Sequence, residues 1–259
     1  MNFILSVALL TVVYLLVAKL ERVRSIQFRS LPRRRPYLAT DATWYVLAIA
    51  ATAVSVFVLR PQLTKLAVGP IAERVGGLPA VGQFVLALVV FDFVSFVVHR
   101  QFHRSDTLWA LHKVHHSTLQ LDGFATTRAH MLENLLRFVP AQGVLFLVGI
   151  PAGMIAPVVA VAAIYGISNH SNLDLDLPWL EGVLVTPRLH RRHHVPATTQ
   201  NNYGAILTVW DRLFSTLHVQ DTTADERFGV PGETDTYPQP FAAAVGRPLL
   251  DIRLARVGG

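Results

Sequence analysis

The chain has no cysteine among its 259 residues. That absence excludes disulfide frameworks, thiolate zinc sites, iron–sulfur clusters, haem–thiolate chemistry and cysteine nucleophiles. Charge is also scarce, since 15% of the residues are Asp, Glu, Lys or Arg, whereas an ordinary soluble domain has about 25%. With 52% hydrophobic residues, the chain either hides most of its surface from water or lies in lipid. The same composition excludes disorder and fibrous repeats.

Long apolar runs are the first feature that is present. Residues 3–18, 42–59 and 77–91 contain no charged side chain. At a rise of about 1.5 Å per residue, each run is long enough to cross, or nearly cross, a hydrocarbon core of about 30 Å. They predict three membrane helices in an N-terminal region, residues 1–90. The first run lacks the basic stretch and the cleavage site of a secretory signal, so we expect it to be retained.

The loops between these runs predict the orientation. Residues 19–41 contain seven Lys or Arg, including Arg33–Arg35, and residues 60–78 contain three. The positive-inside rule therefore places the first loop in the cytoplasm, and two more crossings return the chain there near His99. The net charge of +6 then reflects contact with anionic lipid headgroups. We expect no nucleic-acid partner.

A fourth uncharged stretch, residues 138–167, is too long for one crossing and is interrupted by Gly149–Gly153. Proline and glycine there predict a break that leaves two arms of roughly 12–14 residues, each about 20 Å long. We expect a re-entrant or hairpin segment over residues 138–168, because an odd number of crossings would separate the histidines on either side of it. Residues 219–259 are expected to form a polar C-terminal tail.

Histidine is the residue in excess. The chain has 11 histidines, and ten of them lie between His99 and His194. His99 and His103 are four residues apart at the expected end of a membrane helix, so their rings share one face. Two further segments, HKVHH and HRRHH, have the spacing H-x-x-H-H, which places three rings on or beside one helix face. These segments contain His112, His115, His116, His190, His193 and His194.

Eight imidazoles at helical spacing exceed what one metal ion accepts, so the motifs predict two ions. Imidazole suits iron, zinc, copper and nickel alike. Neutral ligands leave the metals strongly cationic, which favours a site that binds oxygen and oxidises a neighbouring apolar substrate. Asp92 lies on the same helix face as His99, and a carboxylate within a membrane helix needs a partner. We predict that Asp92 accepts an N–H from a ligand histidine.

The segments HRQFH, HKVHHS, RAHMLE, NHSN, TPRLHRRHH and NNYGAILTVWDRLFST together resemble the fatty acid hydroxylase superfamily, also called the sterol desaturase family. Its members are integral-membrane, non-haem di-iron oxygenases, and the resemblance spans residues 91–216. We therefore expect an all-α, polytopic membrane protein with a histidine-rich cytoplasmic cap and a di-iron domain over residues 91–218.

The resemblance also implies a reaction. It is the O₂-dependent hydroxylation or desaturation of a lipid, such as a sterol, a fatty acyl chain or a related lipid. Two iron ions and an external electron donor, such as cytochrome b5 or a ferredoxin, are implied with it, and zinc can replace iron in purified protein. No catalytic side chain is expected beyond the metal ligands.

The family's ligand motifs fall on the eight histidines already named, and its additional ligand falls on His170. Fatty-acid 2-hydroxylases in the family have one more histidine where this chain has Gly166. We expect His130 to supply the missing ligand, and the alternative for His130 is a hydrogen bond or ion pair with Glu133. Asn169 is expected to orient a ligand or a bound water, or to cap a helix.

Two other classes of protein remain open from the residues alone. A histidine-rich membrane metal transporter would distribute its ligands through the membrane span. A zinc-dependent membrane hydrolase would need a general base beside an open zinc position. The sequence has no H-E-x-x-H motif, and Asp92, Asp106 and Glu133 are the nearest acidic candidates.

Overall fold

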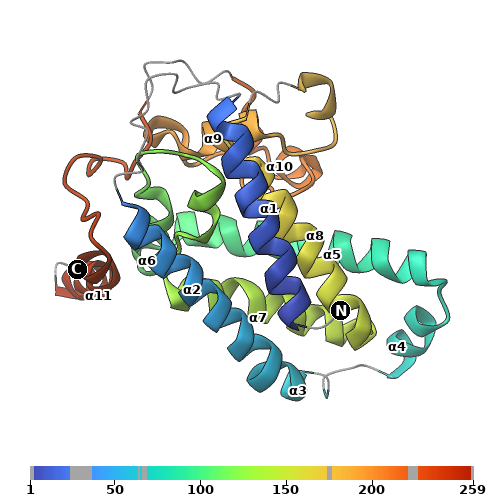
Figure 1. Ribbon diagram of the computed structural model, residues 1–259. Coiled ribbons are helices and arrows are strands. Elements are labelled where there is room, and N and C mark those ends of the chain that lie inside the picture. Colours follow the sequence, from blue (N-terminus) through green and yellow to red (C-terminus); the bar gives the residue numbers. More distant parts are fainter. Residues whose placement is uncertain are drawn as a thin grey trace.

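The computed structural model describes residues 3–23, 37–63, 65, 69–173, 177–220 and 227–257. The basic run Arg33–Arg35, which carries the predicted orientation, lies outside these residues. The fold is all-α, as predicted: the described residues contain no strand, and Leu184 and Leu207 form an isolated antiparallel bridge (Figure 1).

The described residues form a series of helices. The α-helices are α1 (Phe3–Val23), α2 (Leu38–Val54), α3 (Arg60–Leu63), α4 (Gly69–Gly76), α5 (Ala80–Arg104), α6 (Asp106–His116), α7 (Met131–Leu147), α8 (Ala152–His170), α9 (Pro187–His194), α10 (Val209–Leu213) and α11 (Phe241–Val257). The shorter turns are a π-helix, η1 (Ser55–Leu59), and the 3₁₀ helices η3 (Gly123–Thr127), η4 (Pro178–Leu180) and η5 (Pro196–Thr198).

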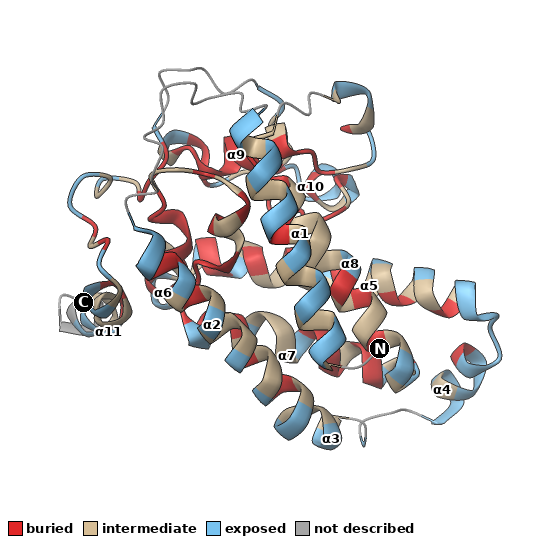
Figure 2. Cartoon of the chain, viewed as in Figure 1, coloured by how far each residue is buried: buried red, intermediate tan, exposed pale blue. Residues whose placement is uncertain are grey.

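Four helical segments are long and apolar enough to cross a membrane. They are Phe3–Val23, Leu38–Leu63, Ala80–Arg104 and Ala152–His170. The first three contain the apolar runs that predicted membrane helices. Along α1, Tyr14 is the buried residue, and Figure 2 shows most of this helix exposed or half-buried. An apolar helix with so little burial against protein is expected to face lipid.

The uncharged stretch after residue 138 is broken into two helices, as predicted, but the first helix begins earlier, at Met131, and the second is longer than expected. The helices α7 and α8 have 17 and 19 residues, and α8 is itself long enough to cross a membrane. The turn between them contains Gly149 at φ +81°. A Cβ there would lie 2.2 Å from the Cα of Ala72, so only glycine fits.

Helices α7 and α8 both pack against α5. The core between the three helices contains Phe91 on α5, Leu145 and Phe146 on α7, and Ile155 and Val158 on α8. Burial of these side chains stabilises the packing by about 1.5–3 kcal/mol each. The packing sets the C-terminal ends of α5 and α8, where His99, His103 and His170 lie, relative to one another.

The C-terminal segment is not the polar tail that the sequence predicted. Helix α11 packs against α6 at the edge of the molecule (Figure 1). Its Ala244 joins Trp44 and Val114 in a buried cluster. The composition of residues 219–259 concealed this helix, because few apolar residues suffice once a partner surface is present.

Burial is concentrated around α6 and α9. Figure 2 shows buried residues gathered in this region, and seven of the eight residues of α9 are buried although the helix reads PRLHRRHH. Such burial of polar side chains requires specific partners.

Candidate metal centre

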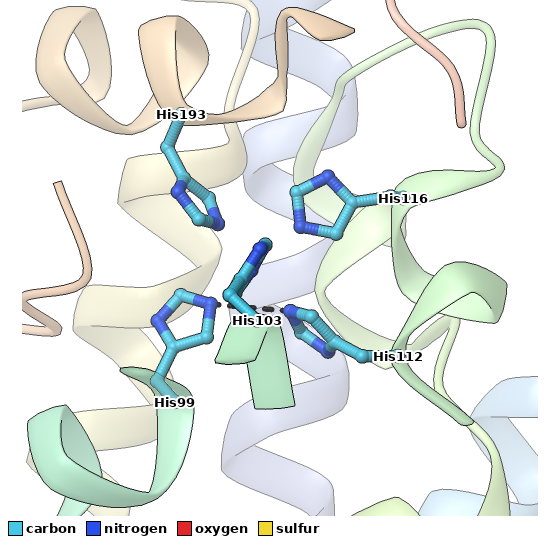
Figure 3. Close-up of side chains that lie close together, drawn as sticks. All are labelled: His99, His103, His112, His116 and His193. Atoms are coloured by element: carbon cyan, nitrogen blue, oxygen red, sulfur yellow. Dashed lines mark hydrogen bonds between the residues drawn. The ribbon is translucent and has the colours of Figure 1, made fainter. Parts of the chain in front are cut away.

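A first group of five histidines comes from three helices. Figure 3 shows their rings converging on a common centre. One ligand nitrogen of each lies within 4.8 Å of those of the others. The Nε2 atoms of His99 and His112 are 3.2 Å apart. The five-histidine group consists of His99 and His103 on α5, His112 and His116 on α6, and His193 on α9.

A second group of four histidines lies beside the first. It consists of His115 on α6, His170 on α8, and His190 and His194 on α9. The Nε2 atom of His170 is 3.1 Å from that of His115 and 2.9 Å from that of His190. The rings of His116 and His194 stack across the boundary with centroids 4.5 Å apart. Two adjacent cation sites would fit this arrangement.

Each H-x-x-H-H motif divides between the two groups. On α6, the outer pair His112 and His116 enters the five-histidine group and His115 enters the four-histidine group. On α9 the assignment is reversed, because His190 and His194 join the four-histidine group and His193 joins the other. Residues four apart lie on one helix face, so each motif supplies a pair to one site and a single ring to its neighbour.

Acceptors outside the groups orient the rings. The Nδ1 atoms of five histidines each face an oxygen, which leaves Nε2 directed inward. The pairs are His99 with the Tyr203 carbonyl at 2.9 Å, His112 with Glu133 Oε1 at 2.7 Å, His115 with the Arg128 carbonyl at 3.2 Å, His170 with the Gly166 carbonyl at 2.8 Å, and His193 with the Asn201 carbonyl at 2.7 Å.

The nitrogens that face inward fit metal ions. All nine histidines are at most 6% exposed. Both ring nitrogens of His103 and His116, and Nε2 of His193, are buried without a hydrogen-bond partner. Unsatisfied buried nitrogens in such number are costly unless a cation binds them. The donor set, which is imidazole throughout, suits iron among other transition metals.

Burial also keeps the histidines of the two groups neutral. It lowers the pKa of each histidine on α6 and α9 below the usual value, and for all of these except His193 the neighbouring imidazoles add to the effect. For His193 the pKa falls to about 4. A neutral imidazole has a free lone pair at pH 7, which metal binding requires. The histidines on α6 and α9 are His112, His115, His116, His190, His193 and His194.

Glu133 is an acidic residue that contacts a histidine of the five-histidine group, and the sequence prediction did not assign it this role. Its carboxylate and His112 are both fully buried. Burial raises the pKa of Glu133 to about 8, and the nearby Arg137, 3.6 Å away, opposes that rise. Cations in the adjacent site would further favour the carboxylate form. The signal in the sequence is the motif R-x-H-x-x-E, whose acid was predicted as an alternative partner for His130 and as a candidate general base of a zinc hydrolase.

His130 lies outside both groups. Its Nδ1 accepts the backbone N–H of Leu132 at 3.2 Å and so caps the N-terminus of α7. Burial lowers the pKa of His130, and a backbone hydrogen bond with Val245 opposes this. The structure therefore gives His130 a capping role in place of the predicted tenth ligand, because its position before α7 turns the ring toward the helix end.

The prediction for Asp92 is wrong. Its carboxylate accepts the backbone N–H groups of Ile206 and Leu207 at 2.8 and 3.0 Å, and the indole N–H of Trp210 at 2.8 Å. No histidine is among these partners. Three donors occupy most of the roughly four acceptor sites of a carboxylate, so Asp92 ties α5 to α10 and to the segment before it.

A second carboxylate, Asp211, shapes the same segment. It accepts the backbone N–H groups of Tyr203 and Gly204 at 2.9 and 2.7 Å. A Cβ on Gly204 would lie 2.8 Å from this carboxylate, so the close approach requires glycine. The segment matters because the Tyr203 carbonyl orients His99.

Asn169 forms a hydrogen bond with the segment that contains Tyr203 and Gly204, and not with a histidine of the two groups. Its Nδ2 donates to the Ala205 carbonyl at 2.9 Å. The predicted role in orienting a ligand is therefore indirect: Asn169 ties the end of α8, which carries His170, to the loop that carries Tyr203.

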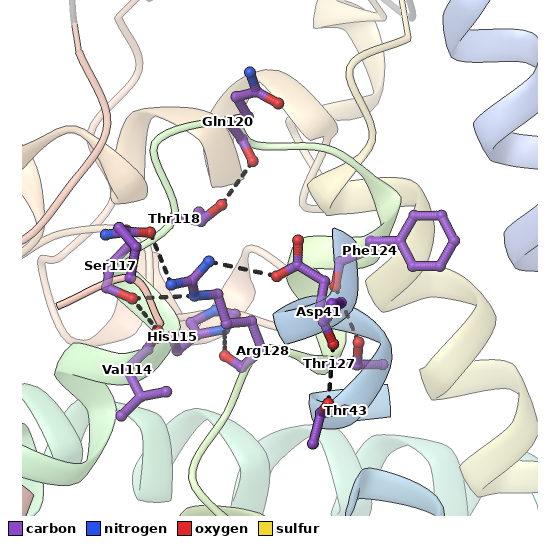
Figure 4. Close-up of polar contacts among 12 residues, drawn as sticks. Asp41, Thr43, Val114, His115, Ser117, Thr118, Gln120, Phe124, Thr127 and Arg128 are labelled. Carbon is purple, nitrogen blue, oxygen red and sulfur yellow. Dashed lines mark hydrogen bonds and ion pairs between the residues drawn. The ribbon is translucent and has the colours of Figure 1, made fainter. Parts of the chain in front are cut away.

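Arg128 orients His115 from a buried polar network (Figure 4). Its guanidinium donates to Gln239 Oε1 at 2.8 Å and Ser117 Oγ at 3.1 Å, and it lies 3.4 Å from Asp41. The side chain is 2% exposed. These contacts join the start of α2, the end of α6 and the segment before α11, and they fix the carbonyl that His115 faces.

A cavity of about 290 Å³ opens on the histidines from the side of the membrane helices. Three members of the four-histidine group, His115, His170 and His190, line it, as does His99 of the five-histidine group. The rest of the lining comes largely from α1, α2, α7 and α8. It is mostly apolar, which suits a lipid chain.

Comparison with known proteins places the chain in a family. The model of the fatty acid hydroxylase family matches residues 84–216, about half of the chain. The chain belongs to this family, whose match covers all nine histidines of the two groups. No solved structure is significantly similar to it.

Three curated relatives illustrate the range of the family. Ornithine lipid hydroxylase OlsE of Rhizobium tropici is 34% identical over 66% of this chain and 51% of its own length. Alkylglycerol monooxygenase of Danio rerio is 32% identical over 51% of this chain and 29% of its own length. Methylsterol monooxygenase 1-3 of Arabidopsis thaliana is 28% identical over 54% of this chain and 50% of its own length. The chain therefore spans about half or less of these relatives.

Proposed function

We propose that this protein is a membrane-embedded, O₂-dependent di-iron oxidoreductase that hydroxylates or desaturates a lipid. One observation carries the proposal: two adjacent groups of buried, neutral histidines lie at the inner end of an apolar cavity. The relatives named above are hydroxylases and monooxygenases of lipids, which supports hydroxylation in particular.

The reaction balances with an external donor. Hydroxylation consumes R–H, O₂, two electrons and two protons, and yields R–OH and water. Desaturation consumes the same electrons, protons and O₂, and yields an alkene and two waters. A one-electron carrier protein of the cytochrome b5 or ferredoxin type would supply the electrons. Iron, when bound, would supply the reductive activation of O₂.

The residues of this chain would prepare the site for that chemistry. The nine histidines would hold the ions, and burial keeps their imidazoles neutral. The carbonyls and Glu133 fix the ring orientations, so that little reorganisation is needed during reaction. The apolar wall of α1 and α8 holds the lipid and excludes water from the open side of the four-histidine group.

The two other classes fit the structure less well. Ligands of a transporter would be distributed along the span, but the two groups gather nine histidines at one end of the helices. A zinc hydrolase needs a general base beside the substrate. None of the described residues that line the cavity is Asp or Glu, and Glu133 faces His112.

Lipid analysis of cells that express the chain, grown with and without oxygen, tests the proposal. We expect a lipid that gains about 16 Da or loses about 2 Da, only with oxygen, and purified protein with two irons per chain. A His190→Ala variant is the matched control. Unchanged lipids with an active donor system, or oxidised lipids formed without oxygen, would contradict the proposal.

The orientation is also a proposal. We propose that the histidine groups lie on the cytoplasmic side, because the first loop is strongly basic. The cysteine-free sequence is a ready background for single-cysteine labelling. In intact cells, an impermeant maleimide should label Gly77→Cys, and it should label Thr107→Cys only after lysis. Both positions are exposed, and the reverse pattern would invert the topology.

A further inference from the structure

The cavity has two unlike walls. On α7, the lining residues Asn134, Arg137, Phe138 and Gln142 follow helical spacing and so share one face. Three of these four side chains are polar. The facing wall on α8 consists largely of small and apolar residues, among them Val159 and Ala163, and α1 adds further apolar side chains. A cavity of this kind suits an amphipathic molecule more than a pure hydrocarbon.

The polar wall carries hydrogen-bond donors that need an acceptor. Asn134 is 8% exposed, and its Nδ2 is buried without a hydrogen-bond partner. A buried unsatisfied donor is costly, and it indicates a ligand or water that completes it. By contrast, Gln142 Nε2 already donates to Ser55 Oγ at 2.6 Å. Asn134 therefore marks the place on this wall where a ligand acceptor is missing.

Arg137 lies one turn after Asn134 and adds positive charge at the same place. Its ion pair with Glu133 is long, at 3.6 Å, and its side chain is 32% exposed, so further donors of the guanidinium are available. No described residue of the cavity wall is Asp or Glu. The second arginine of the wall, Arg60, donates to the backbone carbonyl of Ala152.

We propose that Asn134 and Arg137 bind the oxyanion of an amphipathic lipid, a carboxylate or a phosphate. The proposal rests on the proposed function and names its substrate class. Arg137 is about one helical turn, 5.4 Å, from Glu133 along α7, and Glu133 bonds His112 of the five-histidine group. The anionic group is therefore held close to the metal centre. Consequently the oxidised C–H bond lies within the first few carbons from that group, and the remaining chain extends along α1 and α8.

Equilibrium binding of three tritiated probes to the purified, metal-loaded protein tests the proposal. The probes are palmitate, hexadecyl phosphate and hexadecanol, which share a chain and differ in headgroup. We expect at least one anion to bind roughly 10- to 100-fold more tightly than the alcohol, the equivalent of one charge-assisted hydrogen bond. The preferred anion distinguishes a carboxylate from a phosphate lipid.

Variants locate the preference. Arg137→Leu should reduce the ratio of affinities to about one, Arg137→Lys should retain part of it, and Asn134→Asp should weaken anion binding while the alcohol still binds. Arg74→Leu, on the exposed face of α4, is the matched control and should keep the ratio. Metal content of each variant reports its folding. A ratio that Arg60→Leu abolishes and Arg137→Leu retains would overturn the proposal, as would equal affinities in the wild type.

The position of oxidation separates this proposal from the function on which it rests. With a reducing system, the product of the preferred anion should be oxidised within the first few carbons, and oxidation near the far end of the chain would overturn the binding mode. If the anion preference follows Arg137 but no lipid is oxidised, the proposed function fails and the binding site stands. If lipid is oxidised without an anion preference, the binding site fails.

Discussion

The five-histidine and four-histidine groups share α6 and α9, but the first is completed by α5 and the second by α8, and the two groups differ in what lies beside them. The five-histidine group takes four of its members from α5 and α6 and is largely enclosed, with His99 on the cavity. The four-histidine group has one ligand fewer, and three of its members line the cavity. Near-identical motifs therefore produce unequal sites. The difference suggests a division of labour, in which the four-histidine group has room for an added ligand.

Removal of one ligand from each group is expected to have the largest effect. His194→Ala leaves three histidines in the four-histidine group. The ion of that group should be lost, so that the metal content of the protein falls by half and turnover is lost. His103→Ala leaves four histidines and should retain most of its metal, since four ligands suffice for many sites. Metal analysis of both variants, with His218→Ala as a control outside the groups, measures this. Equal losses would show that the groups are equivalent.

The open position of the four-histidine group can be closed by substitution. Gly166 lies one turn before His170 and lines the cavity, so Gly166→His places a fifth imidazole on the same helix face. We expect metal content to be retained and azide binding, followed by absorption spectroscopy, to be lost. Gly166→Ala adds a Cβ at ordinary contact distance, 3.4 Å from Thr126, and should still bind azide. Unchanged azide binding in Gly166→His would contradict an open position there.

Substitution of Glu133, which lies beside the five-histidine group, is expected to have a smaller effect, confined to the metal affinity of that group. Glu133→Gln retains the size of the side chain and removes the charge that His112 faces at 2.7 Å. Loss of such an outer partner typically costs roughly 10- to 100-fold in metal affinity or activity. Metal competition titrations should show the loss in one of the two sites. An equal loss of metal affinity in both sites would mean that Glu133 acts on both histidine groups.

The smallest effect on the metals is expected at Asp92. Asp92→Asn weakens two hydrogen bonds to the segment before α10 and one to Trp210 of α10. We expect a loss of about 1–3 kcal/mol in stability with both ions retained. Trp210→Phe removes one of these bonds and should cost less. Thermal unfolding and metal content are the measurements. Loss of metal in Asp92→Asn with unchanged stability would indicate a direct role in the site.

Helical spacing predicts the histidines of the two groups, but it does not predict the residues that hydrogen-bond to them or position their partners. His99 and His103, or His112 and His116, are close in the chain, and helical periodicity alone places them on one face. The partners of Asp92 come from residues more than one hundred positions later, which local spacing cannot predict. The same holds for the carbonyl of Arg128, whose position depends on Gln239 and Asp41.

The sequence by itself determined the all-α membrane character, the eight motif histidines and the class of metal that suits them, because hydropathy and helical spacing are local properties. The family resemblance added His170. Only the tertiary structure decided how the motifs divide into groups of five and four, which group meets the cavity, and that Glu133 rather than Asp92 faces a ligand. These outcomes depend on how α5, α6, α8 and α9 pack, and packing brings together residues whose proximity no local pattern encodes.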